Sequence, residues 1–298
     1  MNPLEPISDF VNHRSSLEFE GKPCKESVRR YPRVISVSSG KGGVGKTNVV
    51  ANLGVALTQL GKRVFVLDAE LGLANVDILL GLTPRYTIEH LFKRQKTLKE
   101  ILIKGPGGMF IMPASSGTPE LAALNAGQKF HLLDEFEQLA DHLDILLIDG
   151  GAGISPNVLF FNMAAQETVT IVTPEPTSIA SAYTLIRILS TKYSRRNFSI
   201  LVNLASDEEE AQQAFQELFL HVDQCLKSPS LEYLGFIPFD RRICEAVKLQ
   251  KTVLEIFPQC PVSQRFRELA QLILDKPISR KERGNVQFFS RSLLRSAN

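Results

Sequence analysis

The sequence has little of three things: paired cysteines, long apolar runs and net charge. Its four cysteines lie far apart with no C-x-x-C pair, which argues against a zinc site, an iron–sulfur cluster or a disulfide framework. No stretch approaches the roughly 18 apolar residues that span a bilayer, and residues 1–30 lack the apolar core of a signal peptide. We therefore expect a cytoplasmic protein. The formal net charge of +2 gives no reason to expect a nucleic-acid partner, so nucleic acid is an unlikely ligand.

Short apolar runs alternate with helical patterns from residue 33 onward. A helix is expected over residues 48–60, where apolar residues recur at helical spacing before Gly61. Strands are expected at 34–37, 63–67, 109–112, 144–148, 168–172, 199–202 and 233–237. This alternation predicts an α/β fold with a mostly parallel, twisted sheet and helices on both faces.

The loop after the first predicted strand has the composition of a phosphate cradle. A loop that wraps phosphates needs glycines, a lysine for the β- and γ-phosphates and a hydroxyl for magnesium. Lys46 and Thr47 supply the last two, and Thr47 is a predicted metal-site residue. The predicted nucleotide-binding residues of the loop are Gly40, Lys41, Gly42, Gly43, Val44, Gly45, Lys46 and Thr47. This is a full Walker A match and predicts a P-loop ATPase that binds ATP and Mg²⁺.

A second lysine in this loop, Lys41, resembles the signature lysine of the deviant Walker A loop in the MinD/ParA superfamily, also called SIMIBI. In that family the lysine reaches the nucleotide held by the other subunit. The resemblance implies that a homodimer forms on ATP binding. It also implies that Lys41 and Lys46 are catalytic residues.

Acidic residues follow two of the predicted strands. Asp149 is placed to bind magnesium through its water shell. The segment 68–77 resembles switch I of the family, which makes Asp68 a metal-site residue and Glu70 the catalytic residue that orients the attacking water. The family usually has an aspartate in place of Glu70 and often a threonine in place of Gly150. Because a longer arm displaces the carboxylate, hydrolysis is expected to be slow or nearly absent.

Two further nucleotide contacts rest on the resemblance alone. Asn203 and Asp240 follow strand patterns and correspond to purine-edge contacts of the family. An asparagine after a strand is more often a turn or cap residue.

The C-terminal tail combines basic and apolar residues. On a helical wheel over 285–297, Val286, Phe289 and Leu293 fall on one side, and Arg291 and Arg295 fall opposite. An interfacial membrane helix requires this arrangement, so these five residues are the predicted membrane contacts. The competing interpretation is a helix packed against the domain or a partner. The chain then divides into a flexible extension at 1–30, an ATPase domain at 31–277 and a basic tail at 278–298.

Five segments resemble one branch of the superfamily, the flagellar-number ATPase FlhG, also called FleN or YlxH. They are residues 68–82, 113–117, 149–155, 174–178 and 235–240. The resemblance implies regulation of flagellar number and placement with an FlhF-type GTPase and contact with flagellar switch or regulator proteins. It also implies reversible attachment to the inner face of the cytoplasmic membrane. The DQAxxLR-type motif through which many members stimulate FlhF is not found in residues 1–30.

Three alternatives remain open at this point. A ParA-type DNA partition ATPase would need basic surface patches and should lack a membrane helix. An iron–sulfur carrier of the Mrp/NBP35 type would need the missing C-x-x-C pair. A nucleotide-binding scaffold with little hydrolysis is consistent with Glu70 and Gly150.

Overall fold

The computed structural model describes residues 32–226, 229–277 and 287–289. Its strands are β1 (Arg33–Ser39), β2 (Val64–Asp68), β3 (Ile103–Lys104), β4 (Phe110–Met112), β5 (Ile145–Ala152), β6 (Glu167–Val172), β7 (Asn197–Ala205) and β8 (Ser230–Pro238). Its α-helices are α2 (Lys46–Gln59), α3 (Val76–Leu79), α4 (Ile88–Phe92), α5 (Leu98–Ile101), α6 (Ala126–Gln138), α7 (Pro156–Ala164), α8 (Pro176–Tyr193), α9 (Glu208–Cys225), α10 (Arg241–Lys248), α11 (Val253–Ile256) and α12 (Pro261–Asp275). Short 3₁₀ turns lie at Pro106–Gly108, Pro119–Ala122 and Ala140–His142.

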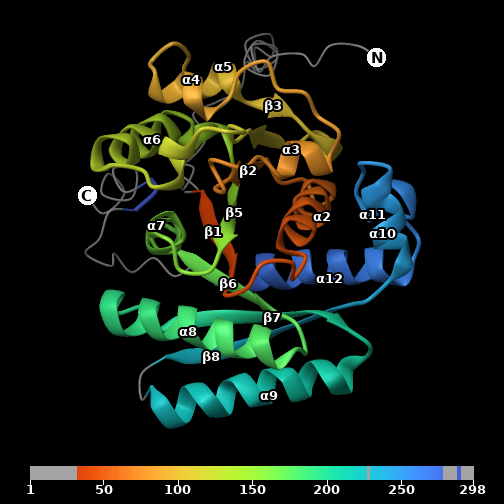
Figure 1. Cartoon of the computed structure of the whole chain (residues 1–298). Coiled ribbons are helices and arrows are strands. Elements are labelled where there is room, and N and C mark those ends of the chain that lie inside the picture. The colour runs from red at the N-terminus through yellow and green to blue at the C-terminus, as the bar shows by residue number, and fades with distance from the viewer. Residues whose placement is uncertain (1–31, 227–228, 278–286, 290–298) are drawn as a thin grey trace, which may run out of the picture.

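The strands form one eight-stranded sheet in the order β3-β4-β2-β5-β1-β6-β7-β8. Every neighbouring pair is parallel except β3 and β4. The helices lie on both sides of this sheet, as Figure 1 shows. Parallel strands with covering helices place all their carboxyl ends at one edge, where such sheets bind ligands.

Apolar side chains of both sheet faces are buried. On one face, α2 and α12 pack on Ile35, Val37 and Leu147. On the other face, α4 to α7 cover the β2 and β5 side of the sheet, while α7 to α9 cover β6 to β8. Burial on both faces explains why these strands read as continuous apolar runs in the sequence. The predicted fold class is confirmed. Among the helices described, none is both long and apolar enough to cross a bilayer.

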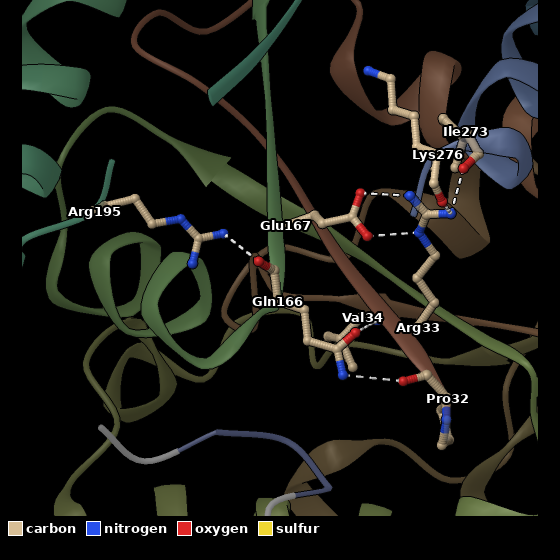
Figure 2. A network of polar contacts seen from close by, with 8 residues as sticks. All are labelled: Pro32, Arg33, Val34, Gln166, Glu167, Arg195, Ile273 and Lys276. Carbon is tan, nitrogen blue, oxygen red and sulfur yellow. Dashed lines mark hydrogen bonds and ion pairs between the residues drawn. The ribbon is translucent and has the colours of Figure 1, made fainter. Parts of the chain in front are cut away.

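A polar network joins the first strand to the last helix at the amino end of the sheet, as Figure 2 shows. Arg33 begins β1, and its buried guanidinium donates from Nε to Glu167 Oε1 at 2.6 Å and from Nη2 to Oε2 at 2.8 Å. It also donates to the carbonyl of Ile273 and, at 3.2 Å, to that of Lys276. Those carbonyls end α12, so one arginine caps that helix and neutralises a strand carboxylate.

Residues 287–289, the part of the predicted tail helix that the structure describes, do not form a helix. Phe288 and Phe289 are fully buried, and both rings contact Phe136 of α6, at centroid distances of 5.3 and 6.5 Å. The Phe288 amide donates to the carbonyl of Ala164 at 3.1 Å, and Phe289 has a φ of +59°, which a right-handed helix does not allow. In this conformation Phe289 therefore faces the domain core, so its assignment as a membrane contact does not hold here. The other predicted contacts, Val286, Arg291, Leu293 and Arg295, lie outside the described residues.

Candidate nucleotide-binding site

Residues Gly40 to Gly45 connect β1 to α2 at the carboxyl edge of the sheet. Gly45 has a φ of +79°, a conformation that glycine adopts without strain, and no side chain caps the helix that follows. A Cβ on Gly40 would lie 2.1 Å from the backbone carbon of Ser181, so α8 leaves room only for glycine. The helix begins at Lys46, two residues earlier than predicted. Lys46 and Thr47 therefore occupy its first turn, where uncapped N–H groups attract anions.

Lys46 forms a buried ion pair at the base of the loop. Its Nζ lies 2.6 Å from Oδ1 of Asp149, which sits near the carboxyl end of β5. The other oxygen of Asp149, Oδ2, is buried and has no hydrogen-bond partner among the described residues. A buried carboxylate oxygen without a donor is costly unless a ligand or water satisfies it.

Asp68 lies beside Asp149, because β2 and β5 pair in parallel with these two residues in register. Its Oδ1 accepts the amide of Glu70, and its Oδ2 accepts those of Asn75 and Val76 at 2.9 and 3.1 Å. Burial, and then the charge of Asp149, raise the pKa of Asp68 from its usual 3.8 to about 7. Two adjacent buried carboxylates and the Thr47 hydroxyl are hard oxygen donors that fit Mg²⁺. The ion would neutralise the repulsion that otherwise favours protonation of Asp68.

The raised pKa of Asp68 predicts a pH-dependent stability of the nucleotide-free protein. Between about pH 4 and pH 7 this carboxyl is protonated when folded and ionised when unfolded, so folding takes up a proton. Stability should therefore fall as pH rises, by about 1 kcal/mol between pH 6 and pH 7.5, and level off above that. Urea titrations at several pH values measure this gradient, and Asp68→Asn should flatten it. An equal gradient in Asp68→Asn would assign it to another group.

Glu70 follows Asp68 on the loop after β2 and is half-buried. Its Oε2 accepts a hydrogen bond from Asn75 Nδ2 at 2.9 Å. The carboxylate expected to orient water is thus held by a residue of its own loop.

Close packing against β1 accounts for the glycine at position 150. A Cβ at this position would lie 2.9 Å from the carbonyl oxygen of Val37, on the neighbouring strand β1. A threonine, common here in the family, would require β1 and β5 to shift, and their register is irregular just beyond Val37.

Lys41 lies at the protein surface in this conformation. Its Nζ is 2.5 Å from Oε2 of Glu175, the N-cap residue of α8, and 3.0 Å from the hydroxyl of Thr177 in the first turn of that helix. The neighbouring ammonium lowers the pKa of Glu175. The side chains of Lys41 and Glu175 are 39% and 61% exposed, so solvent screens the pair and little free energy opposes its opening.

Asn203 and Asp240 have structural partners. The buried Asn203 Nδ2 donates to the carbonyl of Val44 at 2.7 Å, which ties β7 to the phosphate loop. Asp240 caps α10 by accepting the amide of Arg242 at 2.8 Å. Their roles as purine contacts stay predictions.

Three residues around this site were not predicted as site residues from the sequence. Asn75, Glu175 and Thr177 act through contacts that only the folded loops create. These residues lie in segments 68–82 and 174–178, which resemble the FlhG branch, and this resemblance is the feature of the sequence that points to them.

The parallel sheet, the glycine loop and the ion pair between Lys46 and Asp149 of β5 define a P-loop NTPase. The sequence profile of ParA, described as "NUBPL iron-transfer P-loop NTPase", matches residues 30–274. The chain belongs to the ParA family of P-loop NTPases.

Individual relatives agree with this assignment. The chain is 42% identical to "Antiactivator FleN" of Pseudomonas aeruginosa over 262 residues, which cover 88% of this chain and 93% of that protein. It is 30% identical to "Flagellum site-determining protein YlxH" of Helicobacter pylori, over 97% of this chain and 96% of the relative. The MinC:MinD cell division complex of Aquifex aeolicus contains a chain with a TM-score of 0.67 and 28% identity, aligned over 84% of this chain and 99% of that one. The predicted resemblance to the FlhG, FleN or YlxH branch is confirmed.

The description of the family profile mentions iron transfer, but the three cysteines in the described part of the chain do not form a cluster site. Cys225, Cys244 and Cys260 are free thiols on separate elements. Within the described ranges no group of three or more His, Cys, Asp or Glu side chains is arranged to hold a metal ion. These observations give no support to iron carriage.

Proposed function

We propose that this chain is an ATP-dependent dimerising switch that regulates flagellar number and placement and hydrolyses ATP slowly to ADP and phosphate. The observation that carries the proposal is the assembled phosphate site. Lys46, Asp149 and Asp68 lie together beneath an anion-binding helix terminus, while Lys41 lies at the surface on a weak ion pair. In this proposal Lys46 binds the β- and γ-phosphates, and Thr47, Asp68 and Asp149 hold Mg²⁺.

Magnesium, once bound, would neutralise developing phosphate charge, and Glu70 would orient the attacking water. Lys41 would leave Glu175 to contact the phosphates of the nucleotide in the second subunit. Lys41 would then exchange the Glu175 carboxylate for a phosphate, and an exposed, weak ion pair allows this exchange. Asn203 and Asp240 would contact the base.

The flagellar role is carried over from the names of the two relatives. An antiactivator opposes an activator, and a site-determining protein sets position. The proposed partners are an FlhF-type GTPase and flagellar switch or regulator proteins. We place the protein in the cytoplasm, reversibly attached to the inner face of the membrane through its tail. That attachment would require Phe289 to leave the pocket beside Phe136.

A nucleotide-binding scaffold with little hydrolysis is the second candidate, and one observation favours it. The close packing of Gly150 in β5 against β1 disfavours a threonine, and so its hydroxyl, directly after Asp149. Both candidates require nucleotide binding, and they differ only in turnover. A ParA-type DNA partition role has no corresponding observation in its favour.

Flagellar counts test the proposal. In the organism that encodes this chain, cells without it should carry more flagella than wild type, because an antiactivator restrains production. Electron microscopy of single cells gives the count. A wild-type copy should restore the normal number, and Lys46→Ala should not, because it loses the phosphate-binding charge. The same flagellar number in the deletion strain would contradict the proposed role.

A further inference from the structure

The loop that carries Glu70 contains an asparagine in an unusual situation. Asn75 occupies the N-cap of α3, where an asparagine side chain ordinarily accepts an amide of the first helical turn. Its side chain makes no such bond here. Oδ1 of Asp77 accepts the amide of Ile78, the third residue of the helix, and Oδ2 of Asp68 accepts the amides of Asn75 and Val76.

The Asn75 side chain is therefore available for Glu70. Its Nδ2 donates to Glu70 Oε2 at 2.9 Å and to the Leu73 carbonyl at 3.0 Å. The second bond fixes the amide against its own loop, and the first fixes the carboxylate against the amide. Glu70 and Asn75 are both half-buried, so water competes only partly for this bond.

The same residue also links the two carboxylates of the loop. Its backbone amide binds Asp68, and its side-chain amide binds Glu70. A glutamate has one more side-chain torsion than an aspartate, and that freedom would otherwise spread its carboxylate over several positions. The hydrogen bond from Asn75 removes this freedom, because it holds the Glu70 carboxylate at a fixed position relative to Asp68 before water is oriented.

We infer that Asn75 is a positioning residue for ATP hydrolysis, which holds the Glu70 carboxylate in its working position relative to the magnesium-side Asp68. The inference rests on the proposed role of Glu70. Asn75 touches neither nucleotide nor metal in this account and acts only through Glu70. An aspartate at position 70 would be shorter by one methylene and would lose this hydrogen bond.

A double-mutant cycle on the full-length chain tests the inference. Single-turnover and steady-state hydrolysis of Mg²⁺-ATP are measured for wild type, Asn75→Ala, Glu70→Asp and the double variant. Asn75→Ala should lower kcat about tenfold, since one charge-assisted hydrogen bond is lost, with KM for ATP and ATP-dependent dimerisation unchanged. In the Glu70→Asp background the same substitution should change kcat less than about twofold.

The outcomes separate this inference from the proposed function. A purely structural role of Asn75 would lower kcat equally in both backgrounds, or raise KM with it, and would overturn the inference. Glu70→Gln, as the reference for loss of the carboxylate, should lose about 100-fold in kcat. If it does so while Asn75→Ala keeps wild-type kcat, only this inference fails. If Glu70→Gln keeps wild-type kcat, or wild type shows no turnover, the catalytic part of the proposed function fails as well.

Discussion

Replacing Lys41 with alanine is expected to abolish ATP-dependent dimerisation while the monomer still binds ATP. The side chain of Lys41 contacts Glu175 and Thr177, which lie outside the phosphate loop. The monomer's own phosphate contacts come from Lys46 and the first turn of α2, which the substitution leaves in place. Without Lys41 the part of the phosphate charge that faces the second subunit would be buried in the interface without a positive partner there, and such a charge opposes association.

Size-exclusion chromatography with light scattering, with and without Mg²⁺-ATP, measures the oligomeric state. Glu175→Gln is the matched control, because it removes the same surface ion pair from the other side. It should still dimerise, whereas Lys41→Ala should stay monomeric at every ATP concentration. Equal loss in both variants would show that the ion pair itself, rather than a transfer of Lys41 to nucleotide, supports the dimer.

Vesicle binding gives Lys41→Ala a second readout. On vesicles with anionic lipid, wild type should co-sediment only with ATP, since two tails bind more strongly than one. Lys41→Ala should remain in the supernatant. A chain that ends at residue 284 should dimerise and yet remain in the supernatant too. Co-sedimentation of that shortened chain would refute the proposed tail contact.

Much of the site was predictable because its parts are local in the sequence. Gly40 to Thr47 is contiguous, and the conformations it needs follow from glycine and from a helix start. Asp68 and Asp149 are 81 residues apart, yet each comes at the end of an apolar run in the sequence. Parallel pairing places such ends side by side, and β2 and β5 are neighbours in the sheet.

The contacts that tune the site were not predictable in the same way. The bond from Asn75 to Glu70 depends on the turn of an irregular loop that has no periodic pattern. The partners of Lys41 are 134 and 136 residues away, so neither propensity nor spacing indicates them. Phe289 shows the same limitation, because an apolar stripe predicts burial but not whether lipid or Phe136 covers it.

The largest loss of stability is expected for Arg33→Met, at the opposite edge of the sheet from the nucleotide site. The guanidinium of Arg33 is buried. The substitution leaves Glu167 without a bidentate partner and the last carbonyls of α12 without a donor. Breaking a buried pair by removing one partner costs about 3–5 kcal/mol. Because Glu167 is partly exposed, we expect the free energy of unfolding to fall by about 3 kcal/mol. Equilibrium urea unfolding followed by circular dichroism measures the change.

Arg63 provides a matched control for this experiment. It also pairs with a carboxylate through two donors, because its Nε and Nη2 both donate to Asp144, but the side chains of Arg63 and Asp144 are each about one-third exposed. Arg63→Met should therefore cost less than about 1 kcal/mol. The double variant Arg33→Met with Glu167→Gln should recover part of the loss, because it removes the uncompensated charge. Equal losses for Arg33→Met and Arg63→Met would mean that burial of the Arg33 pair contributes nothing, and that α12 is held to the sheet by its apolar face alone.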